Sequence, residues 1–192
     1  FHGSRKPSTH GSLEIGNIRR PQKPMWETLI GMDRYTGEDV NSSLATAWSI
    51  SPSGDEWTFK LREGVQWHDG SEFTADDVVY TLNRHMGEDS ISKVTALVNY
   101  VSEWKKIDKY TMKAILTSAN SDLPAILGTF HFKIIKNGAE GDYFNNPIGT
   151  GPFKSVEFTP GVHTLGVRND NYYRGGVNLD EIESFAITDP VS

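Results

Sequence analysis

Residues 56–77 read EWTFKLREGVQWHDGSEFTADD, and the local structure of this stretch organises the rest of the chain. Trp57, Phe59 and Leu61 alternate with polar residues. Alternation with a period of two residues is typical of a strand that buries one face. The stretch therefore predicts a β-strand at its start.

Two turn signals follow this strand. Glu63-Gly64 can reverse the chain, and Asp69-Gly70 is another strong turn signal because both residue types favour turn conformations. Between them, Val65 and Trp67 continue the apolar pattern. The sequence thus predicts strand, turn, strand and turn in succession.

A helix is predicted over residues 74–86. Thr74 precedes Asp77 by three residues, which is the spacing of an N-cap and an acidic partner in the first turn. One face of this helix would carry an apolar stripe made of Ala75, Val78, Val79, Leu82 and Met86. We expect the stripe to pack in the core and not to contact a cofactor.

Other segments carry weaker patterns. We expect a short helix followed by a strand or turn at 25–35, a short helical piece at 41–50, a helix or a loop at 91–103, a β-hairpin over 104–116, a helical turn at 122–128, a strand at 129–135, a hairpin over 153–168 and a last short element at 179–187. Strand exceeds helix, and no βαβ alternation is evident. The expected fold class is α/β in the broad sense, a mixed α+β lobe.

Composition excludes several classes of protein. The 192 residues include no cysteine, so disulfides, thiolate chemistry and cysteine-based zinc sites are impossible. The formal net charge of −6 argues against a dedicated nucleic-acid binder. No apolar run is long enough to cross a membrane.

The first 24 residues differ from the rest of the chain. They carry five basic residues and one acid, and they lack apolar periodicity. Such a segment is typical of a weakly ordered basic arm, and a loop at a ligand cleft is the alternative that the family resemblance described below implies. No signal peptide is evident at the start FHGSRKPSTH, which indicates a processed, truncated or recombinant form.

Residues 149–153, GTGPF, resemble a phosphate-binding loop only superficially. The Lys and Ser/Thr that would bind phosphate and magnesium are missing, and a strand pattern follows in place of a helix. We expect a tight turn whose glycines adopt positive φ.

No catalytic motif stands out. A GxSxG nucleophile elbow is absent, and no two histidines have the HxxxH or HxH spacing. His68 and Asp69 lie in a predicted turn, where Asp69 would bond the backbone. A metal-dependent hydrolase that uses His68, Asp69 and His131 remains the alternative hypothesis, and a structural interaction module is a third.

Two blocks of sequence resemble one family. Residues 61–84, LREGVQWHDGSEFTADDVVYTLNR, and residues 146–176, NPIGTGPFKSVEFTPGVHTLGVRNDNYYRGG, resemble the peptide- and nickel-binding class of extracytoplasmic solute-binding proteins, bacterial family 5, which are the receptors of ABC importers. Residues 178–189, NLDEIESFAITD, resemble the strand that comes next. Residues 1–24 match poorly.

The resemblance implies a fold and a division of the chain. Family members are two-lobed clamshells of the periplasmic-binding-protein type, and this chain would form one lobe, with the second lobe absent. Residues 1–50 and 146–192 would belong to the core subdomain of the first lobe. Residues 51–145 would form an inserted second subdomain.

The resemblance also implies a function. The family captures peptides, or a related small solute, outside the cytoplasmic membrane and delivers them to the permease subunits of an ABC importer. This implies a periplasmic or extracytoplasmic protein, anchored as a lipoprotein in some full-length forms, with no enzymatic activity, no cofactor and no metal. The membrane would be met only through the transporter.

Candidate ligand-binding residues follow from rough alignment to the family. The cleft side of the first lobe would use Arg20, Trp26, Phe130 and His131. The competing interpretation is that Trp26 and Phe130 belong to the core, and that Arg20 and His131 are ordinary surface residues.

Overall fold

The computed structural model of the chain describes residues 25–32, 39–40, 43–87, 90, 92–139, 147–159 and 162–185. The elements in these ranges are β1 (Gly31–Met32), β2 (Asp39–Val40), β3 (Ala45–Ile50), β4 (Glu56–Leu61), α1 (Ala75–Asn83), the 3₁₀ helix η4 (Thr95–Leu97), β5 (Val101–Asp108), β6 (Thr111–Leu116), α2 (Leu123–Gly128), β7 (Phe153–Thr159), β8 (His163–Arg168) and β9 (Glu181–Phe185). Short helices and antiparallel strands give the expected mixed α/β class.

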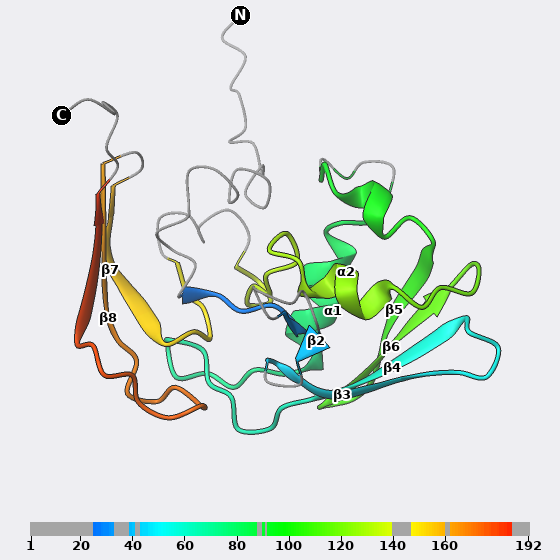
Figure 1. Cartoon of the computed structure of the whole chain (residues 1–192), viewed down its shortest axis with the longest axis horizontal. Coiled ribbons are helices and arrows are strands. Elements are labelled where there is room, and N and C mark those ends of the chain that lie inside the picture. The colour runs from blue at the N-terminus through cyan, green and yellow to red at the C-terminus, as the bar shows by residue number, and fades with distance from the viewer. Residues whose placement is uncertain are drawn as a thin grey trace, which may run out of the picture.

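The strands of the described residues form separate antiparallel sheets. The largest has the order β3-β4-β6-β5, a second has the order β7-β8-β9, and β1 pairs with β2. Figure 1 shows α1 and α2 on one side of the four-stranded sheet, and β7 and β8 at the opposite end of the molecule.

Strand β4, which begins the stretch 56–77, is an inner strand of the largest sheet. β4 pairs with both β3 and β6, and its Trp57, Phe59 and Leu61 are buried as predicted. Gly64 and Gly70 adopt positive φ in the two predicted turns. The second strand of the prediction is wrong, because between these turns only an isolated bridge from Gln66 to Glu72 forms.

Helix α1 confirms the predicted cap. The Thr74 hydroxyl accepts a hydrogen bond from the Asp76 N–H at 3.3 Å, and the Thr74 N–H donates to Asp77 Oδ2 at 2.8 Å. The apolar stripe packs into the core, where α1 contacts β5 and β6. The helix ends at Asn83 and not at residue 86.

The helical prediction for residues 41–50 is wrong, because residues 45–50 form strand β3. Leu44, Ala47 and Trp48 have helical spacing, but a register shift between Ala45 and Ala47 interrupts the two-residue alternation that would have indicated a strand. Pairing of Trp48 with Phe59 on β4 then decides the conformation.

The strand predicted at 129–135 is also wrong. The Phe132 N–H donates to Thr129 O in a turn at the end of α2, and Lys133 forms only an isolated bridge with Thr28. Phe132 and Ile134 are nevertheless buried, because the segment runs beside residues 25–28. The apolar alternation of residues 129–135 therefore reflects burial of alternate side chains, without the strand pairing of a β-sheet.

The short helix predicted at the start of 25–35 is wrong, because Thr28 forms an isolated bridge with Lys133 and β1 covers Gly31–Met32. The remaining predictions agree better with the structure. The hairpins of β5 with β6 and of β7 with β8 form, α2 occupies most of the predicted helical turn, and β9 lies within the predicted last element. The open segment 91–103 contains η4 and the start of β5. Residues 160–161, the predicted turn between β7 and β8, lie outside the described residues.

Candidate functional site

Residues 25–28 are held by segments distant in the sequence. Met25 O accepts the Gly151 N–H at 3.0 Å, and Glu27 O accepts the Ile134 N–H at 2.9 Å. Thr28 O accepts from the Ser43 hydroxyl at 2.5 Å. The segment is therefore fixed by backbone contacts on several sides.

Gly149 approaches this segment more closely than any other residue type could. A Cβ at position 149 would lie 1.7 Å from Met25 O. Neither Gly149 nor Gly151 has positive φ, so the predicted conformational reason for these glycines is wrong. The physical reason at Gly149 is the close backbone approach.

The Glu27 carboxylate is the centre of a partly buried polar cluster, which we call the Glu27 cluster and define as Glu27, Thr150, Tyr172, Tyr173 and Arg174. Its Oε1 accepts from the hydroxyls of Tyr172 at 3.0 Å and Tyr173 at 2.9 Å, and it lies 3.3 Å from Arg174 Nη2. Its Oε2 accepts from the Thr150 hydroxyl at 3.1 Å. The carboxylate thus joins the start of the described chain to the loop after β8.

Burial dominates the electrostatics of this cluster. Burial raises the pKa of Glu27, and the Tyr173 hydroxyl and the Arg174 charge oppose this. Burial and the nearby Glu27 charge raise the pKa values of Tyr172 and Tyr173, so both hydroxyls remain protonated donors. The sequence of residues 169–176 indicates only a polar and aromatic loop. The only signal was the run of two tyrosines and an arginine.

Trp26, a predicted ligand residue, is only 4% exposed. Its indole N–H donates to Ile148 O at 3.0 Å, and the Lys133 ammonium lies 5.9 Å from its ring centroid. Its position is consistent with the competing interpretation of a core residue, although a ligand role for Trp26 stays a prediction.

Phe130 and His131 lie in the turn after α2. Phe130 is 46% exposed and so is not a core residue, and its ring centroid lies 3.8 Å from that of His131. Burial lowers the pKa of His131, and its Nδ1 is buried without a hydrogen-bond partner. Phe130 is thus an exposed aromatic ring beside a half-buried histidine, and the exposed ring is a candidate for ligand contact.

The structure brings three of the four predicted site residues onto neighbouring segments. The bridge between Thr28 and Lys133 and the Ile134–Glu27 hydrogen bond align residues 26–28 with residues 133–134. Arg20 lies outside the described residues. The role of all four in binding stays a prediction.

His68 and Asp69, the basis of the hydrolase alternative, are occupied by structural contacts. His68 Nδ1 accepts the Gly149 N–H at 3.1 Å, which places the proton on Nε2, 3.0 Å from Gly151 O. Burial lowers the pKa of His68 and favours this neutral form. Neither ring nitrogen remains available for a metal or a proton transfer.

Asp69 bonds the backbone, as expected for a turn residue. Its Oδ1 accepts the Ser71 N–H at 3.0 Å, and its Oδ2 pairs with Lys136 at 2.5 Å. Burial would raise its pKa, but the bonds from Lys136 and Ser71 outweigh burial and lower the pKa to about 2. His131 lies in the turn after α2, apart from this cluster.

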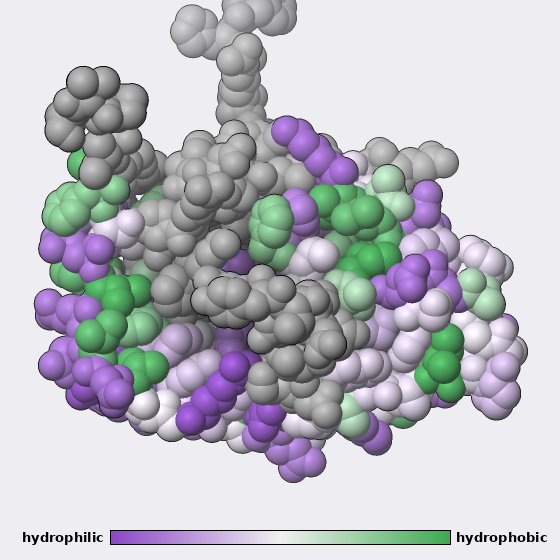
Figure 2. Space-filling model, viewed as in Figure 1, coloured by the Kyte–Doolittle hydropathy of each residue, from purple (hydrophilic) through white to green (hydrophobic). Residues whose placement is uncertain are grey.

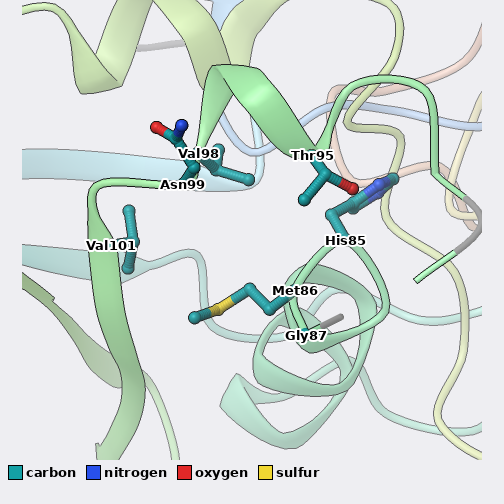
Figure 3. Close-up of a pocket in the computed structure, with 7 residues that line it drawn as sticks. All are labelled: His85, Met86, Gly87, Thr95, Val98, Asn99 and Val101. Atoms are coloured by element: carbon teal, nitrogen blue, oxygen red, sulfur yellow. The ribbon is translucent and has the colours of Figure 1, made fainter. Parts of the chain in front are cut away.

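A pocket of about 370 Å³ lies between the end of α1, η4 and the start of β5. Figure 3 shows the Met86 side chain extending toward Val98 and Val101. The ring of His85 bonds Ser92 Oγ at 2.8 Å and contacts Phe132 edge-on, and burial lowers its pKa to about 4.

Hydrophobic surface gathers in several places, since Ile50 on β3 and Ile107 on β5 are also exposed. Figure 2 shows one over η4 and α2 at the upper right and another over β7–β9 at the left. The large exposed hydrophobic residues of these regions are Leu97 and Phe130 in the first, and Val156, Val162, Leu179 and Phe185 in the second. The described residues contain no group of three metal-ligating side chains and no helix long and apolar enough to span a membrane.

Comparison with known proteins identifies the fold. The structure resembles that of the binding protein AgaA from A. tumefacien R10, determined in complex with agropinic acid, with a TM-score of 0.81 and 23% identity over 95% of this chain and 38% of that chain. At this identity the likeness concerns the fold alone. It agrees with the expected lobe of a periplasmic binding protein.

Two relatives in sequence are named for the peptides that they bind. The chain is 30% identical to the dipeptide-binding protein of Escherichia coli over 88% of its own length and 36% of the relative's. It is 30% identical to the oligopeptide-binding protein AppA of Bacillus subtilis over 96% of its own length and 38% of the relative's. The chain thus spans little more than a third of these relatives.

A sequence model for the family described as bacterial extracellular solute-binding proteins, family 5 (middle), matches residues 39–192. This range includes both blocks on which the resemblance was based. The hydrolase alternative finds no support among these relatives. The chain belongs to the bacterial extracellular solute-binding proteins of family 5.

Proposed function

We propose that this chain is part of the substrate-binding component of an ABC importer and captures peptides outside the cytoplasmic membrane. The observation that carries this proposal is family membership together with two relatives named for dipeptide and oligopeptide binding. The exposed Phe130 with its neighbour His131 supplies an aromatic surface of the kind that binding sites use.

The protein acts by binding and carries out no catalysis. Both ring nitrogens of His68 are used by the backbone of residues 149–151, and Asp69 is paired with Lys136. Permease subunits receive the loaded protein, and its location is periplasmic or extracytoplasmic, with a lipid anchor in a full-length form.

The chain acts as one lobe with two subdomains. Residues 1–50 and 146–192 form the core subdomain, and residues 51–145 form the inserted one. Strand β3 (residues 45–50) ends the first range and pairs with β4 of the inserted range, so one sheet joins the two proposed subdomains. Closure of two lobes over a ligand then follows from the higher affinity of the closed form.

Isothermal titration calorimetry tests the function. We expect the complete protein encoded by the reading frame that contains this chain to bind dipeptides or tripeptides. The 192-residue chain alone should bind the same peptides weakly or not at all, because it would supply only part of the contacts. Micromolar affinity of this chain alone would contradict the one-lobe proposal, and a complete protein that binds no peptide would contradict the peptide assignment.

A further inference from the structure

The Glu27 cluster has no part in the function as proposed so far. The Glu27 side chain is 10% exposed, and its carboxylate receives three hydroxyl hydrogen bonds and pairs with one guanidinium. These donors come from Thr150 and from residues 172–174, more than 120 residues away along the chain. So many converging donors allow the carboxylate one position.

The same residue is bonded through its backbone to the candidate ligand segment. Glu27 O accepts the Ile134 N–H at 2.9 Å, and the next residue, Thr28, bridges Lys133. The turn at Phe130 and His131 immediately precedes this contact. The position of Glu27 therefore determines where residues 130–134 meet residues 26–28.

A second set of contacts extends from Tyr173. The guanidinium of Arg62 lies 5.0 Å from the Tyr173 ring centroid, and Arg62 Nε donates to Ser43 O at 3.3 Å. Ser43 in turn bonds Thr28 O. The Tyr173 ring and hydroxyl thus connect Glu27 to the place where the chain enters β3, at Ser43, and leaves β4, at Arg62.

Stability alone does not account for a buried carboxylate here. Removing a charge from water is costly, and well-packed apolar residues of similar volume often give equal or greater stability than a buried ion pair. What a carboxylate with several directed donors supplies is a unique position. We therefore infer that the Glu27 carboxylate serves to fix the position of residues 25–28.

We propose that Glu27 is a positioning residue for solute binding, which fixes Trp26 and the Phe130–His131 turn at the spacing that the ligand requires. This inference rests on the proposed function. Glu27 itself does not touch the solute. It acts through the backbone of residues 26–28 and its contact with residues 133–134.

The test compares Glu27→Gln with Asp170→Asn in the complete protein. Glu27→Gln retains the shape but removes the charge and one acceptor oxygen, whereas Asp170 is a carboxylate of the same loop that is 79% exposed and pairs with Arg168. Calorimetry uses the dipeptides that the wild type retains from an equimolar dipeptide library. We expect Glu27→Gln to weaken binding about tenfold, or about 1.4 kcal/mol, and Asp170→Asn to leave it unchanged.

Hydrogen exchange monitored by NMR shows whether the segment itself has moved. The Ile134 and Gly151 amides, which bond Glu27 O and Met25 O, should exchange faster in Glu27→Gln and not in Asp170→Asn. Tyr172→Phe, which deletes one donor and keeps the ring, should give a smaller change of the same sign in both measurements. It also serves if Glu27→Gln fails to fold.

The outcomes separate this inference from the proposed function. Unchanged dipeptide affinity in folded Glu27→Gln and Tyr172→Phe overturns the positioning role, while wild-type binding upholds the function. A purely structural role predicts faster exchange and lower stability with the same affinity, which also overturns the inference. Failure of the wild type to retain any dipeptide refutes the peptide function, and the inference falls with it.

Discussion

Two regions of the molecule differ in how far along the sequence their contacts reach. The first is residues 56–86, and the second, which we call the junction, is where residues 25–28 meet residues 130–134 and 149–151. In the first region, the capping bond joins Thr74 to Asp77 across three positions of sequence. In the junction, the bond from Trp26 to Ile148 spans 122 positions. The first region is encoded locally, and the junction exists only once the chain is folded.

The difference explains which residues each region uses. Local structure needs turn glycines, alternating apolar residues and a cap, and each leaves a pattern in sequence. A junction needs close approach and matched donors, which leave no periodic pattern. The two regions should therefore respond differently to substitution.

Gly149→Ala should be among the most damaging single changes in the junction. A Cβ there would overlap Met25 O, so the backbone must move, and we expect a loss of about 3 kcal/mol in the free energy of unfolding. Gly176→Ala is the matched control, because a Cβ at position 176 meets no atom within 4 Å. Chemical denaturation of both variants measures the effect. Equal stabilities would mean that the close approach at Gly149 is not required.

Asp77→Ala tests the point where the locally encoded region meets the junction. Asp77 is 5% exposed and accepts from the Thr74 N–H at 2.8 Å and the Asn137 N–H at 2.9 Å. Leaving these two donors and the Trp67 indole N–H, which lies 3.4 Å from Asp77 Oδ2, unpaired should cost about 2 kcal/mol. Denaturant unfolding provides the measurement.

Asp76 gives a control one residue away in the same helical turn. Its side chain is half exposed and pairs with Lys106 on the surface, so Asp76→Ala should cost about 0.5 kcal/mol or less. A comparable loss in both variants would show that the first turn of α1 depends on charge near the helix start and not on the buried bonds of Asp77.

The sequence predicted the locally encoded region well and the junction poorly. The alternation of Trp57, Phe59 and Leu61, the turns at Gly64 and Gly70 and the cap at Thr74 all leave local patterns in the sequence, although β4 itself pairs with the distant β6. Strand β3 was mistaken for a helix because a register shift obscured its alternation. Its conformation depends on pairing with β4, which sequence spacing alone does not reveal.

The candidate site shows the same limit more strongly. Phe130 and His131 were proposed from family resemblance, and the turn that exposes Phe130 contradicts the strand predicted there. Glu27 was not proposed at all, since its partners Tyr172 and Tyr173 approach only in the folded chain. Conversely, His68 was considered as a catalytic or metal-binding residue, but its ring bonds the backbone of Gly149 and Gly151.

The bond from Gly149 to His68 should make the junction sensitive to acid. The pKa of His68 is lowered by burial, so the unfolded chain takes up a proton more readily than the folded chain. The stability that neutral His68 contributes is therefore complete above a pH of about 6.5 and is lost as pH falls toward the folded pKa. His85 and His131, with lowered pKa values, act in the same direction.

Thermal unfolding between pH 7.5 and 5 measures this effect in wild type, His68→Gln and His163→Gln. His68→Gln should lose less stability on acidification than the wild type. His163 lies between Glu157 and Glu183 on the β7–β9 sheet, where its pKa is raised, so its contribution is present at low pH and is lost as pH rises. His163→Gln should therefore keep the His68 acid response. Identical pH profiles for wild type and His68→Gln would exclude the His68 bond as an acid-sensitive contact.

Phe130→Ala should have the smallest effect on stability. Compared with Phe132→Ala, it distinguishes a residue that contacts the ligand from one that supports the fold. Because the ring is 46% exposed, its removal should change the free energy of unfolding by about 0.5 kcal/mol or less. Dipeptide affinity of the complete protein should fall, since an exposed aromatic face contributes contact area to a ligand. Phe132→Ala, two residues away and fully buried, should instead destabilise the fold by about 3 kcal/mol. Loss of stability without loss of affinity in Phe130→Ala would assign this ring to packing and move the search for the ligand surface elsewhere on the lobe.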